Sequence, residues 1–275
     1  EFRIVREIGR GGMGVVYLGR HQMLKRPAAI KLIRTEAAGS PKAIAQFEKE
    51  VQATATLSHW NTIQIYDYGT TEDGDFYCVM EYLVGVTLQQ RIAQHSRRKE
   101  PMTVQKTLEI IDQLCDGLVE AHQKGLIHRD IKPANIFLAE IGGFTDVVKL
   151  LDFGLVVSET ETRDKQRAPT GGTPAYMSPE QIRGDSLDGR SDIYSIGCVM
   201  FECFTGLPPF HSVPMTQLLS DHLFRTPRYN EVSKIDPRLT PILDKCLAKD
   251  RNNRFPDVAS LSDACRQLQS AAAIS

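Results

Sequence analysis

The sequence carries little net charge and no long apolar run. Its 33 basic and 34 acidic residues leave a formal net charge of −1 over 275 residues. Proteins that bind nucleic acid or an acidic membrane surface usually carry a basic excess, so this balance argues against both functions. No stretch of about 18 consecutive apolar residues occurs, as a bilayer-spanning helix would need. We therefore expect a globular domain that makes no contact of its own with nucleic acid or membrane.

The six cysteines lack the spacing of a metal site or a redox motif. No C-x-x-C pair occurs, and Cys198 and Cys203 are poorly spaced for a shared metal. We expect buried free thiols in a reducing compartment, and hence a cytoplasmic location. The chain opens EFRIVREIG, without Met or a signal-like segment. An alternative is therefore the cytoplasmic domain of a longer, membrane-anchored protein.

The order of the apolar segments predicts two lobes. Short β-branched and apolar stretches, separated by glycine or proline, are typical of strands and occur at 2–9, 15–20, 27–34, 63–68 and 75–81. Ser40 as N-cap and Pro41 at the first helical position predict one helix among them. After Gly85 the apolar spacing becomes helical, at 103–124, 191–205, 214–223, 238–249 and 256–269. This pattern predicts an α+β fold with a small β-rich lobe at about 1–81, a hinge at about 82–85 and a larger, mostly α-helical lobe at about 86–275.

A glycine-rich segment, GRGGMGVV, places Gly9, Gly11 and Gly14 on the pattern G-x-G-x-x-G. By itself the pattern also fits a tight turn that binds nothing. A dinucleotide-binding fingerprint would open a helix, whereas VVYLGR predicts a second strand here. The segment therefore predicts a hairpin whose bare backbone can approach phosphate groups closely.

Lys31 lies in the middle of an apolar strand, AAIKLI. A lysine is rarely buried without a partner, so it either faces outward at a strand edge or forms an ion pair. Glu50, on the predicted helix, supplies a candidate carboxylate. A Lys31–Glu50 pair would hold the ammonium against a phosphate.

Residues 126–135, LIHRDIKPAN, crowd charged and polar groups between apolar stretches. Asp130 and Asn135 lie on this loop, and VVKLLDFG places Asp152 at the end of a strand. If these three side chains converge, their oxygens form a hard ligand set suited to Mg²⁺ and to substrate phosphates. His128 is interpreted as a hydrogen-bonded structural residue, because Asp130 beside a lysine is the better general base.

Together these motifs resemble a protein kinase domain. The likeness covers essentially the whole chain, residues 1–275, and keeps the order of the family. The matching segments are Gly9–Val16, Ala28–Lys31, Glu50, His128–Asp130 with Asn135, Asp152–Gly154 and Ser178–Glu180. Asp192 falls where the family has a structural Asp. Arg254 falls where it has a buried Arg that pairs with the Glu matching Glu180. The fold implied is the bilobal one of protein kinases, in which the smaller lobe holds one main helix.

The resemblance implies a role for each polar residue of the site. Lys31, oriented by Glu50, would hold the α- and β-phosphates of ATP. Asp130 would accept the proton of the substrate hydroxyl, and Lys132 would contact the γ-phosphate.

The resemblance also implies the cofactors ATP and Mg²⁺. Asn135 and Asp152 would bind the metal ion. Met80 takes the gatekeeper position, and the backbones of Glu81 and Leu83 would bond the adenine edge. The residues implied to contact or orient the nucleotide are Ile8, Gly9, Arg10, Gly11, Gly12, Met13, Gly14, Val15, Val16, Ala29, Lys31, Glu50, Met80, Glu81, Leu83 and Phe137.

Two segments, Asp130–Lys132 and Gly172–Tyr176, resemble the serine/threonine branch, and the style of the C-terminal half is most similar to bacterial kinases of eukaryotic type. HWNTI at 59–63 stands where His-Pro-Asn is usual, and Ser178 replaces an Ala. Neither departure touches the residues of the reaction. The resemblance thus implies a kinase that transfers the γ-phosphate of Mg-ATP to Ser/Thr hydroxyls of proteins.

Control of activity is implied as well. Arg129 would pair with a phosphate on the activation loop, which runs over 152–180. We expect autophosphorylation at Thr170, which follows Arg167; the alternatives are the 160–162 pair and a constitutively active loop. The partners implied are protein substrates and a second copy of the chain for trans-autophosphorylation.

Two other functions remain open at this point. A pseudokinase scaffold would have the same fold, but it usually lacks counterparts of Lys31, Asp130 or Asp152. A kinase for small molecules on a related fold would lack the Gly172–Glu180 segment, which shapes a peptide-docking surface in protein kinases.

Overall fold

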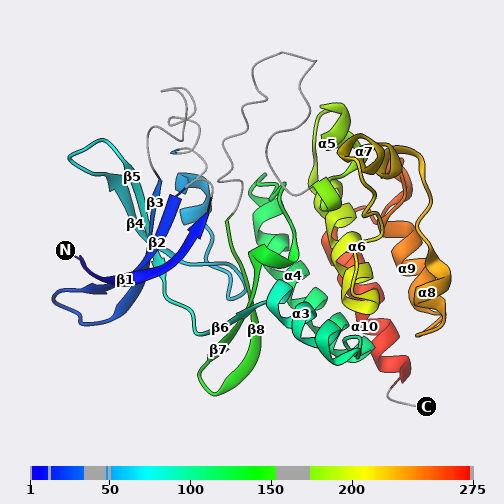
Figure 1. Cartoon of the computed structure of the whole chain (residues 1–275), viewed down its shortest axis with the longest axis horizontal. Coiled ribbons are helices and arrows are strands. Elements are labelled where there is room, and N and C mark those ends of the chain that lie inside the picture. Colours follow the sequence, from blue (N-terminus) through cyan, green and yellow to red (C-terminus); the bar gives the residue numbers. More distant parts are fainter. Residues whose placement is uncertain (1, 12–13, 34–47, 49–50, 153–173, 273–275) are drawn as a thin grey trace.

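Five antiparallel strands form the first sheet of the computed structural model, which describes residues 2–11, 14–33, 48, 51–152 and 174–272. The spatial order is β1-β2-β3-β5-β4. The strands are β1 (Phe2–Gly11), β2 (Gly14–His21), β3 (Pro27–Ile33), β4 (Ile65–Thr70) and β5 (Phe76–Glu81). This sheet lies at one end of the molecule (Figure 1).

The first sheet closely follows the predicted strands, because β-branched and apolar residues of β3 and β5 are buried. Ala28, Ile30 and Val79 form one apolar cluster, and Ile33 packs with Phe76 in another. The fourth strand differs, since it begins at Ile65 rather than residue 63. Of the predicted helix, residues 48 and 51–55 are helical, whereas Ser40 and Pro41 lie outside the described residues.

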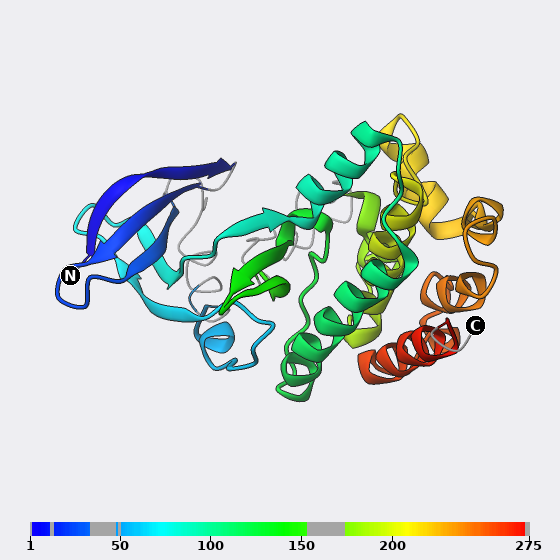
Figure 2. The same cartoon turned by 90° about the horizontal axis from the view of Figure 1, so that it is seen from below.

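A second, three-stranded sheet connects the two parts of the molecule (Figure 2). Its order is β6-β7-β8. The strands are β6 (Gly85–Thr87), β7 (Ile136–Ile141) and β8 (Phe144–Leu150). Of these strands only β8 was predicted, because β6 is too short to show a period and β7 directly follows the polar loop. Thr62 forms an isolated bridge to Leu150 of β8, which explains why β4 starts late.

The larger lobe is mostly helical. Its helices are α3 (Leu88–Arg98), α4 (Val104–Gln123), α5 (Pro179–Arg183), α6 (Gly189–Thr205), α7 (Met215–Phe224), α8 (Tyr229–Ser233), α9 (Leu239–Cys246) and α10 (Val258–Ala272), with 3-10 turns η1 (Pro133–Asn135), η3 (Pro174–Tyr176) and η4 (Arg251–Asn253). Helix α6 is buried along nearly its whole length and packs against α4 and α9. The large core cluster joins Leu114 and Leu118 of α4 to Ile196 and Phe204 of α6.

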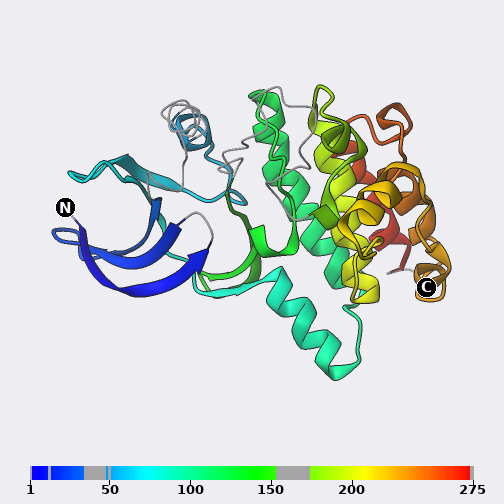
Figure 3. The same cartoon turned by 45° about the horizontal axis from the view of Figure 1, so that its top comes forward.

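This arrangement agrees with the predicted α+β fold: a small sheet lobe, with helices gathered on the other side of the second sheet (Figure 3). The predicted helices near 103–124, 191–205 and 256–269 correspond to α4, α6 and α10. Helices α3, α5 and α8 were not predicted. All six cysteines are buried free thiols, as expected. Among the described residues, no helix combines the length and apolar character needed to cross a membrane.

Candidate active site

The residues predicted to carry the chemistry come from both lobes and from the second sheet between them. Lys31 lies on β3 of the first sheet, between Val16 of β2 and Cys78 of β5 in the strand register. Asp130 precedes the turn η1, whose last residue is Asn135. Asp152 follows the end of β8. The two sheets thus bring together groups from distant parts of the chain.

Lys31 forms an ion pair with Asp152. The distance between Lys31 Nζ and Asp152 Oδ1 is 2.7 Å, and the lysine side chain is only 15% exposed. Burial by itself would raise the pKa of the Asp152 carboxyl, but the positive charges of Lys31 and Lys132 hold it below its ordinary value. Asp152 therefore stays ionised and can bind a cation. Glu50, the predicted partner of Lys31, lies outside the described residues.

Asp130, Lys132 and Asn135 form a hydrogen-bonded group. Lys132 Nζ lies 2.7 Å from Asp130 Oδ2. The amide nitrogen of Asn135 donates to the same oxygen at 3.0 Å and to the Asp130 carbonyl at 2.9 Å. Because the amide nitrogen is engaged in this way, the amide oxygen of Asn135 is the atom left for a cation.

His128 connects this loop to the strand that precedes Asp152. Its side chain is fully buried, and ring atom Nε2 lies 2.8 Å from the carbonyl oxygen of Leu151. The structural interpretation of His128 is therefore confirmed. The bond sets the distance between the Asp130 loop and the end of β8, where the predicted metal ligand lies.

Asp192 of α6 fixes the same loop through hydrogen bonds. Its buried carboxylate accepts hydrogen bonds from the backbone amides of His128 at 2.9 Å and Arg129 at 3.0 Å. It also lies 2.8 Å from Nε2 of His122. Arg129 has a φ of 66°, a conformation that costs about 1–3 kcal/mol in a residue with a side chain. The contacts to α6 stabilise this strained backbone beside Asp130.

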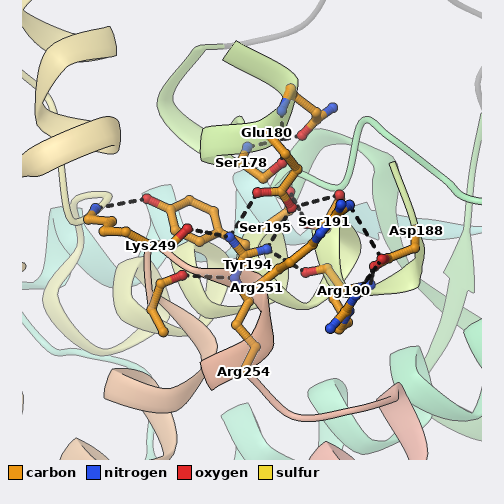
Figure 4. Close-up of polar contacts among 12 residues, drawn as sticks. Ser178, Glu180, Asp188, Arg190, Ser191, Tyr194, Ser195, Lys249, Arg251 and Arg254 are labelled. Atoms are coloured by element: carbon orange, nitrogen blue, oxygen red, sulfur yellow. Dashed lines mark hydrogen bonds and ion pairs between the residues drawn. The ribbon is translucent and has the colours of Figure 1, made fainter. Parts of the chain in front are cut away.

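The pair of Glu180 and Arg254 fixes the start of α5 (Figure 4). Two bonds of 2.6 and 2.9 Å join the guanidinium to the carboxylate, and Ser191 donates a third at 2.7 Å. Burial favours the neutral acid, but Arg254 and Ser191 lower the pKa of Glu180 below its usual value. The pairing implied by the resemblance is thus present, and it anchors the segment that precedes α6.

The glycine-rich segment forms a hairpin, as predicted, in which Gly11 of β1 pairs with Gly14 of β2. A Cβ at position 14 would lie 2.0 Å from the carbonyl oxygen of Leu32, so only glycine fits there. The side chain of Arg10 is exposed and paired with Glu7, and Arg10 itself is opposite Val15 in the register of β1 and β2. Gly12 and Met13 lie outside the described residues.

The residues predicted for the adenine pocket come from several strands, and Met80 and Glu81 lie at the end of β5. Met80 is opposite Ala29 in the register of β5 and β3. Phe137 of β7 is half-buried and pairs with Thr87. The amide of Glu81 donates to the carbonyl of Gln64 at 3.0 Å, so a contact of Glu81 with a base would go through its carbonyl oxygen. Ile8, also predicted for this pocket, lies on β1 and Val16 on β2, whereas Leu83 follows β5; Gly9 and Val15, predicted more generally to contact the nucleotide, lie on β1 and β2.

Several residues with specific contacts were not identified from the sequence. The carboxylate of Glu120 accepts bonds from the backbone amides of Ser58 and His59 at 3.0 and 2.8 Å, which ties α4 to the segment before β4. Lys149 is buried within β8, and the signal that drew attention to Lys31, a lysine in an apolar strand, was present there too. Nothing in the local sequence distinguished Glu120.

Thr170, the predicted phosphorylation site, lies outside the described residues.

Comparisons with known proteins agree with this geometry. The family model for the protein kinase domain matches residues 2–267. The serine/threonine-protein kinase PknB of Mycobacterium tuberculosis is 38% identical over 264 residues, which cover 92% of this chain and 40% of that protein. The serine/threonine-protein kinase pkn3 of Myxococcus xanthus is 35% identical over 269 residues, which cover 96% of this chain and 48% of that protein. The chain thus spans less than half the length of these relatives.

Solved structures show the same fold. The crystal structure of the Mycobacterium tuberculosis PknI kinase domain is similar with a TM-score of 0.76 and 28% identity. The similarity covers 97% of this chain and 95% of that one. The predicted bilobal fold and the predicted resemblance to bacterial kinases are therefore confirmed.

Proposed function

Because the chain belongs to the protein kinase family, we propose that it is an active serine/threonine protein kinase, which transfers the γ-phosphate of ATP to hydroxyl groups of proteins. The proposal rests on two groups of contacts that occur together. Lys31 lies 2.7 Å from Asp152, and Asp130 is bonded to Lys132 at 2.7 Å and to Asn135 at 3.0 Å. His128 couples the two groups. We take the domain to span residues 1–275, with the hinge at about 82–85.

The residues fit Mg-ATP. The family generally uses ATP and Mg²⁺, and the metal neutralises charge on the phosphates during transfer. Magnesium prefers a few protein oxygens together with waters and phosphate oxygens. The ionised Asp152 and the amide oxygen of Asn135 offer such a pair, and among the described residues there is no cluster of three or more His, Cys, Asp or Glu that suits another kind of metal site.

Each of these polar groups would have a role in phosphate transfer. Lys31 would exchange part of its contact with Asp152 for the α- and β-phosphates. Among the bonds of the described residues, both side-chain donors to Asp130 use Oδ2, so Oδ1 remains to accept the proton of the substrate hydroxyl. Lys132 would then lie beside the γ-phosphate as negative charge shifts. Positioning and electrostatics supply most of the catalysis.

The proposed partners are protein substrates that carry Ser or Thr and a second copy of the chain. Arg129 is exposed, and within the part of the chain that the structure describes its guanidinium forms no ion pair, so we propose that it meets a phosphate on the activation loop. We propose Thr170 as that site, with the 160–162 pair as the alternative. The proposed location is cytoplasmic, either alone or as part of a longer, membrane-anchored protein, as the chain's partial coverage of its relatives allows.

The test is phosphate transfer by the purified chain. With Mg-ATP it should phosphorylate casein or myelin basic protein and itself, whereas small alcohols and aminoglycosides should remain unmodified. Lys31→Met is the matched inactive control. Transfer by that variant at the wild-type rate, or transfer only to small molecules, would contradict the proposal. An inactive wild-type chain that still binds ATP would instead identify a pseudokinase.

A further inference from the structure

Lys149 is a buried charge that the proposed reaction does not use. Its side chain is 4% exposed, and Nζ lies 2.8 Å from Oε1 of Glu81. The carbonyl oxygen of Thr62 lies at 3.5 Å from the same nitrogen. An ammonium in such a place is stable only when it is paired. The ion pair of Lys149 and Glu81 is therefore part of the packed interior, unlike the exposed ion pairs of the surface.

The two partners of this ion pair belong to the two sides of the proposed nucleotide site. Glu81 ends β5 and leads into the hinge, and its backbone is proposed to meet adenine. Lys149 lies on β8, the strand that leads to Asp152. One short ion pair thus connects the base-binding segment with the strand that carries the predicted metal ligand.

Residues 59–63 lie next to the ion pair of Lys149 and Glu81. It is fixed to β8 by bonds that do not involve Lys149: the amide of Ile63 donates to the Leu150 carbonyl at 3.0 Å, and the Asn61 side chain donates to the Val148 carbonyl at 2.8 Å. The position of this segment therefore does not depend on the Lys149 charge.

Trp60 lies within that fixed segment, with its ring over the ammonium. The distance between Lys149 Nζ and the ring centroid is 5.2 Å, within the range of a cation–π contact. The Trp60 side chain itself is 56% exposed. An exposed tryptophan at the place where the family usually has proline is explained if its ring shields the ion pair from water.

We propose that Lys149 and Trp60 are positioning residues for the nucleotide: together they hold Glu81, and with it the hinge, at a set distance from β8 and Asp152. The inference rests on the proposed function, because it requires ATP to bind between these elements. Neither residue contacts the nucleotide. Hinge contacts with adenine are the same in the ground state and the transition state, so their loss should raise KM for ATP more than it lowers kcat.

The experiment measures initial rates against ATP concentration, together with the affinity for Mg-ADP and the melting temperature. Lys149→Met should raise KM for ATP and Kd for ADP by the same factor, about 2- to 30-fold, with kcat changed less than either. Trp60→Leu should act in the same direction and more weakly, by about 2- to 5-fold. Lys106→Met is the control, because it removes a lysine whose equally short ion pair with Asp146, 2.8 Å, joins the first turn of α4 to β8 and does not involve Glu81; its KM should stay at the wild-type value.

The double variant Lys149→Met/Glu81→Gln guards against a trivial loss of folding, since it leaves no half-buried carboxylate without a cation beside it. It should melt near the wild-type temperature and still show the raised KM. Wild-type KM and ADP affinity in Lys149→Met and Trp60→Leu, with only the melting temperature lowered, would overturn the inference. A wild-type chain that transfers no phosphate overturns the proposed function, while the ADP affinities still decide the inference. A wild-type chain that binds no nucleotide overturns both.

Discussion

Lys31 Nζ lies 2.7 Å from Asp152 Oδ1, although 121 residues separate the two in the chain. The bond joins β3 of the first sheet to the end of β8 in the second. The proposed phosphate-binding cation and the proposed metal-binding anion thus lie in direct contact. Binding of Mg-ATP would exchange part of this contact for one from Lys31 to phosphate and one from Asp152 to metal.

Replacement of Asp152 by Ala should therefore abolish phosphate transfer without unfolding the chain. The side chain is 36% exposed, so its loss leaves no cavity in the core. Nucleotide affinity, measured with and without Mg²⁺, should lose its dependence on the metal. Asp185→Ala, which removes an exposed acid beyond α5, is the control. An unchanged metal dependence in the Asp152 variant would exclude this residue as a ligand.

Asp130→Asn should fold normally and bind Mg-ADP as the wild type does. The change is nearly isosteric, and the phosphate-binding Lys31 is untouched. Turnover should fall by about 10²- to 10⁴-fold, the usual effect of losing a positioned acid or base. Steady-state rates at saturating ATP provide the measurement. Turnover close to that of the wild type would show that another group accepts the proton.

Thr170→Ala should lower the rate of phosphate transfer, because the activation loop would lose the phosphate proposed to pair with Arg129. Mass-spectrometric mapping after incubation with Mg-ATP should find phosphate on Thr170 in the wild type. Thr160→Ala serves as the comparison and should retain the wild-type rate. Fully active enzyme without phosphate at Thr170 would refute the assignment.

Arg254→Met should destabilise the fold by about 3–5 kcal/mol, because it leaves the buried carboxylate of Glu180 without its partner. Urea unfolding monitored by circular dichroism gives the free energy. Arg238→Met, which breaks the exposed pair with Asp236, should leave the unfolding midpoint almost unchanged. Equal stability of the two variants would argue that the Glu180–Arg254 pair contributes no more than a surface contact.

Glu120 should make the fold sensitive to acid. Burial tends to raise the pKa of its carboxyl, but Lys124 and the amides of Ser58 and His59 lower it from 4.5 to about 2. The folded pKa lies below the unfolded one, so the contribution is complete above pH 4.5 and is lost as the pH falls toward about 2. As the pH falls from 4.5 toward about 2, the melting temperatures of the wild type and Glu120→Gln should converge. A difference that stays constant over this range would contradict the lowered pKa of Glu120.

Much of this protein is determined by local sequence. Short apolar and β-branched stretches in β3 and β5 identify these strands, which are largely buried. The three- and four-residue apolar spacing identifies helices such as α4, because it lines one side of a helix. The order of the motifs around Gly14, Lys31, Asp130 and Asp152 was sufficient to indicate the family and the candidate site. Short elements such as β6, α5 and α8 were missed, since a few residues do not display a period.

The tertiary structure decided which charges meet. The bond between Lys31 and Asp152 was not predicted from the sequence, and the predicted partner Glu50 lies outside the described residues. Lys149 and Glu81 are 68 residues apart, and neither carries a local sign that it will find the other. Such pairs depend on how the two sheets pack, because a buried charge is stabilised only by the groups that folding brings within a few ångströms of it.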